Sequence, residues 1–141
     1  MENKVVNLED FYTEKNEAKG VWYEPEIDGK PCGLEFLIIG IHSEEAIEKM
    51  ERYDAQMNEL YETEKDKDVL SKKEKEIDAE RVASITKGVR AAGGKELQKD
   101  GKPFEFSTEA VKEFYLNTPV IKLANIEFAL KSSNFMNVKN V

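Results

Sequence analysis

Residues 20–41 read GVWYEPEIDGKPCGLEFLIIGI, and this stretch decides the fold. Aromatic and β-branched side chains stand on both sides of the turn Asp28-Gly29-Lys30-Pro31, a pattern typical of an antiparallel hairpin. Pro25 has no amide hydrogen to give to a ladder, so the first strand is expected at a sheet edge or bulged near that residue. The second strand, residues 34–41, is apolar on both faces, and we expect helices to cover at least one of them.

A charged helical region is predicted after this hairpin, from residue 43 to residue 90. Ser43 is an N-cap candidate, and the acids Glu44 and Glu45 that follow it suit the positive end of a helix dipole. Apolar residues then recur at steps of three and four, which predicts one stripe facing the core. The stripe consists of Ile47, Met50, Met57, Leu60 and Tyr61. Its two methionines leave open a second interpretation, an adaptable binding groove.

Residues 62–68 are almost all charged and interrupt the stripe. Ser71 and Glu74 have the spacing of a capping box, so a second helix is expected to begin at Ser71 and to reach Gly88 or slightly beyond. One long helix is the alternative, because the chain has neither glycine nor proline between Ile41 and Lys87. The two versions predict an antiparallel helix pair or a rod.

Residues 100–135 reuse some of this local chemistry. The turn Asp100-Gly101-Lys102-Pro103 leads to Ser107 or Thr108 as a helix cap, and that helix is expected to end before Pro119. A last helix is predicted over residues 120–130, with an apolar face so broad that it is either deeply buried or offered to a partner. Asp-Gly-Lys-Pro is followed by Glu-Phe and by Ser-x-Glu-Ala at two places in the chain, but at different spacing. We interpret this as recurring turn and cap chemistry in preference to a duplication.

The predicted fold class is therefore α+β, mainly α-helical, with an N-terminal antiparallel β-hairpin packed on helices. Residues 1–19 are expected to be partly ordered, with one helical turn from Asn7 to Tyr12. Residues 20–136 are expected to form a single domain, and residues 137–141 a flexible tail. The parts of the domain are the hairpin 20–41, the helical middle 43–90 and the C-terminal helices 107–131.

Composition argues against several function classes. The single cysteine, Cys32, and the single histidine, His42, cannot supply an internal disulfide, a zinc cluster or a Cys-His nucleophilic pair. No phosphate-binding loop or EF-hand pattern occurs, so no catalytic residue, cofactor or metal is expected. A small hydrolase that uses only carboxylates is an alternative, and it would require a pocket with perturbed carboxylates.

The net charge of −8 is unevenly distributed. Residues 1–42 carry 4 basic and 9 acidic side chains, residues 43–81 carry 8 and 14, and residues 82–141 carry 9 and 6. Without a basic stripe, binding to nucleic acid is not expected. The longest apolar run, residues 36–41, is too short to span a membrane, and the first residues are not a secretory signal. These features predict a soluble intracellular protein.

The order of these features resembles the tail assembly chaperones of long-tailed bacteriophages. The resemblance covers roughly residues 20–136 and rests on short motifs. They are Gly20-Val21-Trp22 with the hairpin, the charged helical middle, the stretch DGKPFEFSTE at 100–109, Pro119, and Asn134-Phe135. Many members of the family carry a tryptophan shortly after the middle helix, where this chain has Lys87-Gly88-Val89.

The resemblance implies a non-enzymatic role in the host bacterial cytoplasm: binding the tape-measure protein and bringing tail-tube subunits to it, with self-association left open. We hypothesise that the C-terminal helices supply the binding surface, with Phe104, Phe128 and Phe135 as anchors, because large aromatic residues commonly carry interface energy. The alternative is that all three are core residues.

Two further hypotheses concern the gene and a rival function. Such families often make an extended product by ribosomal frameshifting, and the codons of Val138, Lys139 and Asn140 are candidates for a slip-prone run. The rival function is a phage or bacterial adaptor or inhibitor that binds one host protein through the hairpin edge or a helix groove.

Overall fold

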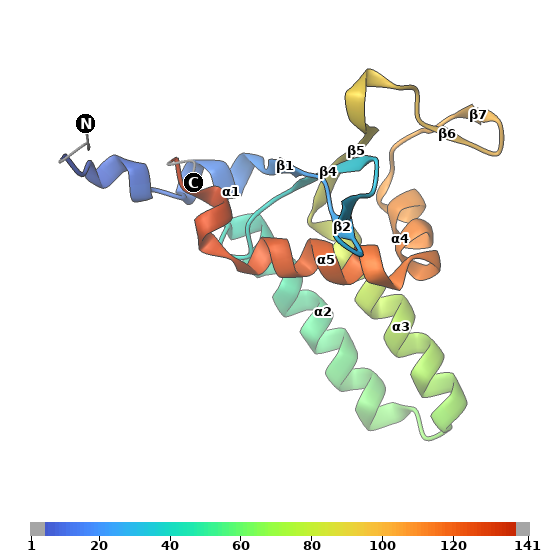
Figure 1. Ribbon diagram of the computed structural model, residues 1–141. Coiled ribbons are helices and arrows are strands. Elements are labelled where there is room, and N and C mark those ends of the chain that lie inside the picture. The colour runs from blue at the N-terminus through green and yellow to red at the C-terminus, as the bar shows by residue number, and fades with distance from the viewer. Residues whose placement is uncertain (1–4, 138–141) are drawn as a thin grey trace.

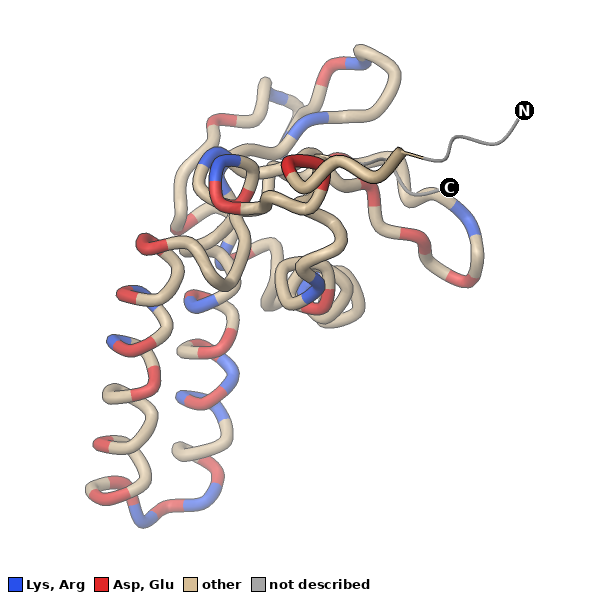
Figure 2. The backbone as a smooth tube through the Cα atoms, turned by 90° about the vertical axis from the view of Figure 1, so that its left-hand side faces the viewer, with Lys and Arg blue, Asp and Glu red and all other residues tan. Residues whose placement is uncertain are grey.

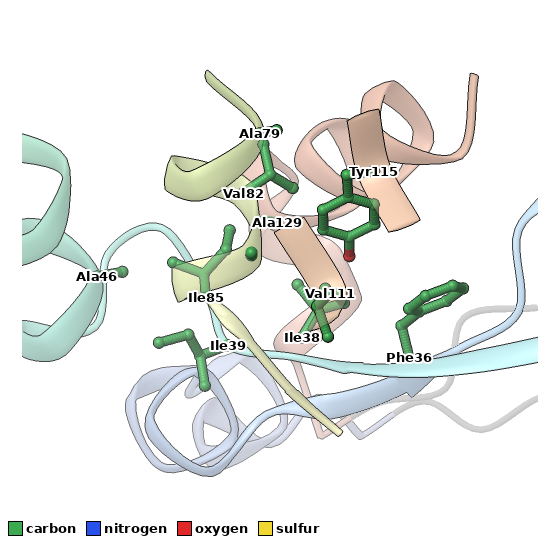
Figure 3. Packing of buried hydrophobic residues seen from close by; sticks show 11 residues of the cluster. Phe36, Ile38, Ile39, Ala46, Ala79, Val82, Ile85, Val111, Tyr115 and Ala129 are labelled. Carbon is green, nitrogen blue, oxygen red and sulfur yellow. The ribbon is translucent and has the colours of Figure 1, made fainter. Parts of the chain in front are cut away.

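The computed structural model describes residues 5–137 and has the α+β architecture that the sequence predicts. A three-stranded antiparallel sheet in the order β1-β4-β5 lies against helices, and a helical hairpin formed by α2 and α3 extends away from this body (Figure 1). Figure 3 shows buried side chains of β4 and of the helices gathered between the sheet and the helical layer. The core therefore lies on one face of the sheet.

The central strand is β4 (Leu34–Ile38), which pairs with β1 (Val21–Tyr23) on one side and β5 (Thr86–Ala91) on the other. Phe36 and Ile38 point into the core and are fully buried, whereas Leu37 lies on the opposite face beside Trp22. β1 is an edge strand, as Pro25 predicts. The predicted pairing of the two runs is thus confirmed, and helices cover one face.

Along the chain, the segment between β1 and β4 forms a separate ladder of two short strands. β2 (Glu26–Ile27) and β3 (Lys30–Pro31) flank Asp28-Gly29, and the same geometry recurs where β6 (Gln98–Lys99) and β7 (Lys102–Pro103) flank Asp100-Gly101. Both Asp-Gly pairs have positive φ, at 53° and 78° in the first turn and 53° and 76° in the second. Two successive positive φ angles define the type I′ turn, which favours Asp-Gly in two-residue hairpins.

The extent of the helical middle needs correction. The second helix ends at Ser84, and residues 86–91 form β5 instead of continuing the helix to Gly88 or to residue 90. β4 has an apolar inner face, and its edge opposite β1 is open to a further strand. Pairing of residues 86–91 with this edge outweighs the local helical pattern. Thr86 and Val89 are β-branched, and Gly88 is a poor helix former, so the local preference for helix was weak.

The middle consists of two helices, α2 (Glu44–Thr63) and α3 (Lys67–Ser84), which resolves the choice between a pair and a rod. Ser43 caps α2 by accepting a hydrogen bond from the amide of Ala46, as predicted. α3 begins four residues before Ser71, because Asp66 accepts hydrogen bonds from the amides of Asp68 and Val69. Figure 2 shows acidic and basic residues along both helices of this hairpin.

The two C-terminal helices lie close to their predicted positions. α4 (Thr108–Asn117) is capped by Ser107, whose hydroxyl accepts from the amide of Ala110 at 3.0 Å. α5 (Pro119–Leu130) begins with proline in its first turn, where the missing amide costs nothing. A 3-10 turn, η2 (Ala92–Gly94), joins β5 to the β6–β7 hairpin.

The two ends of the described chain lie together. The predicted turn near Asn7 is the 3-10 helix η1 (Leu8–Phe11), and a short helix that was not predicted follows as α1 (Glu14–Lys19). Both contact the C-terminal segment, where η3 (Ser132–Phe135) follows α5. Asn137, assigned to the flexible tail, donates from its backbone amide to the carbonyl of Asp10 at 3.1 Å and from Nδ2 to that of Glu9 at 2.8 Å. The candidate frameshift codons, at Val138, Lys139 and Asn140, lie outside the described residues.

Candidate protein-binding surfaces

The helix α5 is apolar on both its inner and its outer side. Asn125 and Ala129 are buried against the core, whereas Val120, Leu123 and Leu130 are each more than half exposed. A helix with a broad apolar face normally has that face covered by protein. The outer side of α5 is not enclosed here, so it is the first candidate surface.

These three exposed residues follow a heptad-like spacing with Glu127 between them. Val120, Leu123, Glu127 and Leu130 are separated by three, four and three residues, which places them along one line of the helix. We call these four residues the α5 seam. A second helix laid along such a line can insert its own apolar side chains between them.

An open hollow of about 400 Å³ adjoins the seam, and aromatic rings form its floor. Phe128 stacks on Tyr23 with 4.2 Å between ring centroids and 16° between planes, and Phe135 meets Phe128 edge-on at 5.6 Å. Asn134 Nδ2 donates to the carbonyl of Phe128 at 2.9 Å and fixes the end of the helix. Burial raises the pKa of Tyr23, and the nearby Glu26 adds to the effect, so this ring stays neutral.

The three predicted anchors have different environments. Phe128 is half-buried and lines the hollow beside α5. Phe135 is fully buried behind it, so in this structure it is a core residue and cannot contact a partner directly. Phe104 lies apart from both and lines a different cavity. The structure thus brings Phe128 and Phe135 together and leaves Phe104 separate.

The second candidate surface is the cavity lined by Phe104, which we call the hairpin groove. It has a volume of about 200 Å³ and lies between the β6–β7 hairpin, α4 and the end of the sheet. Its walls include Leu34 and Val89 from the sheet, Leu97 and Phe104 from the hairpin segment, and Ala110 and Phe114 from α4. Lys99 Nζ and Glu113 Oε2 are 2.9 Å apart and connect the hairpin to α4.

The outer face of the sheet carries the single tryptophan. Trp22 is 37% exposed, and the Arg90 guanidinium lies 3.8 Å from the centre of its ring. A Cβ at Gly88 would lie 3.0 Å from Trp22 Cη2, so the indole occupies the space that a side chain at position 88 would need. The resemblance leads one to expect a tryptophan in the region of Gly88. The indole of Trp22, which belongs to β1, covers Gly88 instead.

The carboxyl groups with perturbed pKa values belong to ion pairs. Hydrogen bonds from Lys49 and then Lys87 lower the pKa of Glu45. Burial alone would raise the pKa of Asp78, but Lys122 and Arg81 outweigh burial and lower it. Neither carboxyl group lines the hollow or the hairpin groove. Among residues 5–137, no group of three or more histidine, cysteine, aspartate or glutamate side chains is placed to hold a metal ion.

The sequence indicated part of these surfaces. Leu123 and Leu130 belong to the broad apolar face predicted for the last helix, whereas the sequence predicts for Tyr23 only a place in a strand. Nothing in the local sequence around Tyr23 indicates that its ring stacks on Phe128, because the two meet only after β1 and α5 pack together.

Comparisons with protein-family models, with curated proteins and with solved structures gave no match. No helix in the described part of the chain combines the length and the apolar character that crossing a membrane requires.

Proposed function

We propose that this protein is a non-enzymatic bacteriophage tail assembly chaperone that acts in the host bacterial cytoplasm. In this role it binds the tape-measure protein, keeps it soluble, and helps to recruit tail-tube subunits. The observation that supports the proposal best is the exposed α5 seam beside a preformed aromatic floor, on a chain whose net charge is −8. Exposed apolar surface on a soluble body is what a holding chaperone requires.

The seam also indicates which kind of client segment it binds. Its spacing fits an amphipathic helix whose apolar side chains alternate with Val120, Leu123 and Leu130. Glu127 interrupts the apolar line, and a lysine or arginine opposite it would fix the register of the client helix. We therefore expect the client segment to be helical, with one basic residue within its apolar stripe.

The charge distribution supports the solubilising part of the role. Residues 43–84, which include the α2–α3 hairpin, carry 14 acidic and 8 basic side chains. This hairpin extends away from α5 (Figure 1), so a client on the seam leaves it free in solvent. Net negative charge on a projecting element opposes aggregation of the complex.

Co-expression with the tape-measure protein tests the proposal. We expect the tape-measure protein to be soluble when this chain is present and to precipitate when it is absent. Unchanged solubility would remove the main support for the chaperone role. The gene order gives an independent check, since the gene of a chaperone should lie between those of the tail-tube and tape-measure proteins.

A second candidate function is an adaptor or inhibitor that binds one host protein. It is favoured by the outer edge of β5, which has no strand neighbour among the described residues and lies next to the hairpin groove. Such an edge can accept an added strand while the groove takes one of its side chains. A host protein captured by the wild-type chain but not by a Val89→Pro variant would favour this candidate over the chaperone.

A further inference from the structure

The outer face of the sheet shows how this fold holds an arginine side chain. The Arg90 guanidinium lies 3.8 Å from the centre of the Trp22 ring, and its Nε donates to a carboxylate oxygen of Glu35 at 2.6 Å. A guanidinium is planar and weakly hydrated, so it can stack on an aromatic ring while its N–H groups bind a carboxylate. One aromatic ring and one carboxylate are therefore the elements of an arginine site.

The hollow beside α5 is lined by the same two kinds of group. Tyr23, which follows Trp22 in β1, and Phe128 contribute rings stacked at 4.2 Å between centroids, and Glu127 contributes a carboxylate. Burial raises the pKa of Tyr23, and the negative charges of Glu26 and Glu127 raise it further. Both carboxylates thus act on the aromatic floor, which lies at negative potential.

These two carboxylates have no basic partner in the described part of the chain. Glu26 and Glu127 are exposed, and neither forms an ion pair within residues 5–137. Lys131 also lines the hollow, where the chain continues past the end of α5. The two acidic groups outnumber this one basic group, so the charge around the aromatic floor favours a cation.

We infer that the hollow binds an arginine side chain of a partner protein. The guanidinium stacks on the floor formed by Tyr23 and Phe128 and pairs with Glu127. The volume of about 400 Å³ is ample, since about 150 Å³ already holds a benzene molecule. Arginine is preferred to lysine because an ammonium is strongly hydrated and cannot stack. This deepens the proposed function by naming the client's basic residue, and it rests on that function only for the identity of the client.

NMR titration of the whole isotope-labelled chain with Nα-acetyl-arginine methylamide tests the site. We expect saturable shifts at the amides of Tyr23, Glu127 and Phe128, with millimolar affinity because one side chain makes few contacts. The citrulline analogue has the same shape without the charge, and it should bind at least about fivefold more weakly. The corresponding glutamate derivative should not shift these residues.

Three variants assign the effect to particular charges. Glu127→Gln keeps the shape of the hollow and should weaken binding of the arginine probe at least about fivefold without affecting the citrulline probe. Lys131→Gln should tighten binding of the arginine probe, because it removes the repelling charge. Glu48→Gln, at an exposed acid of α2, is the matched control and should bind like the wild type.

Equal binding of the arginine and citrulline probes would overturn the inference, as would unchanged binding in Glu127→Gln or preferential binding of the glutamate probe. Either result would leave the chaperone proposal standing, because co-expression tests that role without the probes. Conversely, a tape-measure protein that precipitates in co-expression would remove the chaperone role and leave an arginine site that these titrations support.

Discussion

At the scale of single residues, the most constrained group is a chain of hydrogen bonds inside the core. Asn125 Nδ2 donates to Tyr115 Oη at 2.8 Å, and Tyr115 Oη lies 2.7 Å from Thr86 Oγ1. Thr86 Oγ1 donates to the carbonyl of Val82 at 3.0 Å, so its oxygen is free to accept the tyrosine proton. The chain ties α5, α4 and β5 to α3 through buried polar atoms.

Removing the middle hydroxyl should be costly. Tyr115→Phe leaves Asn125 Nδ2 without its acceptor in a residue that is already fully buried and whose Oδ1 has no partner. We expect a loss of about 1–3 kcal/mol in the free energy of unfolding, measured by urea denaturation. Tyr61→Phe is the matched control, because its hydroxyl binds Glu74 at the surface and its loss should cost less than about 0.5 kcal/mol. Equal losses in the two variants would contradict this account.

Tyr115 also predicts a loss of stability in alkali. Burial raises the pKa of Tyr115 to about 12, although hydrogen bonds with Thr86 and Asn125 oppose the effect. The unfolded chain has a tyrosine pKa of about 10, so the folded state binds this proton more tightly. The resulting stability is complete below pH ~10 and falls as pH rises toward ~12. Urea denaturation across this range should show the fall, and Tyr115→Phe should show a smaller one.

At the scale of elements, strand pairing determines the conformation of a segment whose local pattern favours a helix. The local pattern predicts helix as far as Gly88 or slightly beyond, within a helical middle that ends at residue 90, because Val89 continues an apolar spacing of three and four residues. The stretch 86–91 forms β5 because the free edge of β4 accepts it, and that edge exists only in the folded sheet. The caps, by contrast, follow from neighbouring residues alone. Ser43 is predicted and acts as a cap, and of the two candidates Ser107 and Thr108 it is Ser107 that acts as one.

The same distinction applies to the candidate surfaces. The broad apolar face of α5 could be predicted from the sequence, because the spacing of residues along a helix is a local property. Which of its sides stays exposed depends on packing: Ala129 is buried against the core, whereas Leu123 and Leu130 face outward. For the same reason Phe135 and Phe104 could not be sorted into core and cavity residues beforehand.

The start of α3 gives a prediction at this scale. Asp66 caps the helix, whereas Ser71, the residue predicted as its cap, lies within it. Asp66→Ala should therefore lower the free energy of unfolding by about 1 kcal/mol, measured by urea denaturation. Ser71→Ala is the control and should leave stability unchanged or slightly raised, since alanine favours helix interiors. A larger loss of stability in Ser71→Ala than in Asp66→Ala would show that α3 does not begin after Asp66.

At the scale of the whole molecule, the candidate binding surfaces and the charged helical hairpin occupy different parts of the fold. The α5 seam and the hairpin groove belong to the body, while the α2–α3 hairpin extends from it with charged residues along both helices (Figure 2). The ion pair of Asp78 with Lys122 connects α3 to α5 where the hairpin leaves the body, and Arg81 pairs with the same carboxylate from within α3. Under the proposed function, the body would bind the client while the hairpin remains solvated.

The central claim is that the α5 seam binds the tape-measure protein, and the affinity of one variant pair tests it most directly. Leu123→Asp places a charge in the seam, and Leu116→Asp places one at an exposed apolar residue of α4. Isothermal titration with a soluble helical segment of the tape-measure protein should show at least about tenfold weaker binding for Leu123→Asp, or about 1.4 kcal/mol. Leu116→Asp should bind like the wild type. Equal affinities for wild type and Leu123→Asp would contradict the claim.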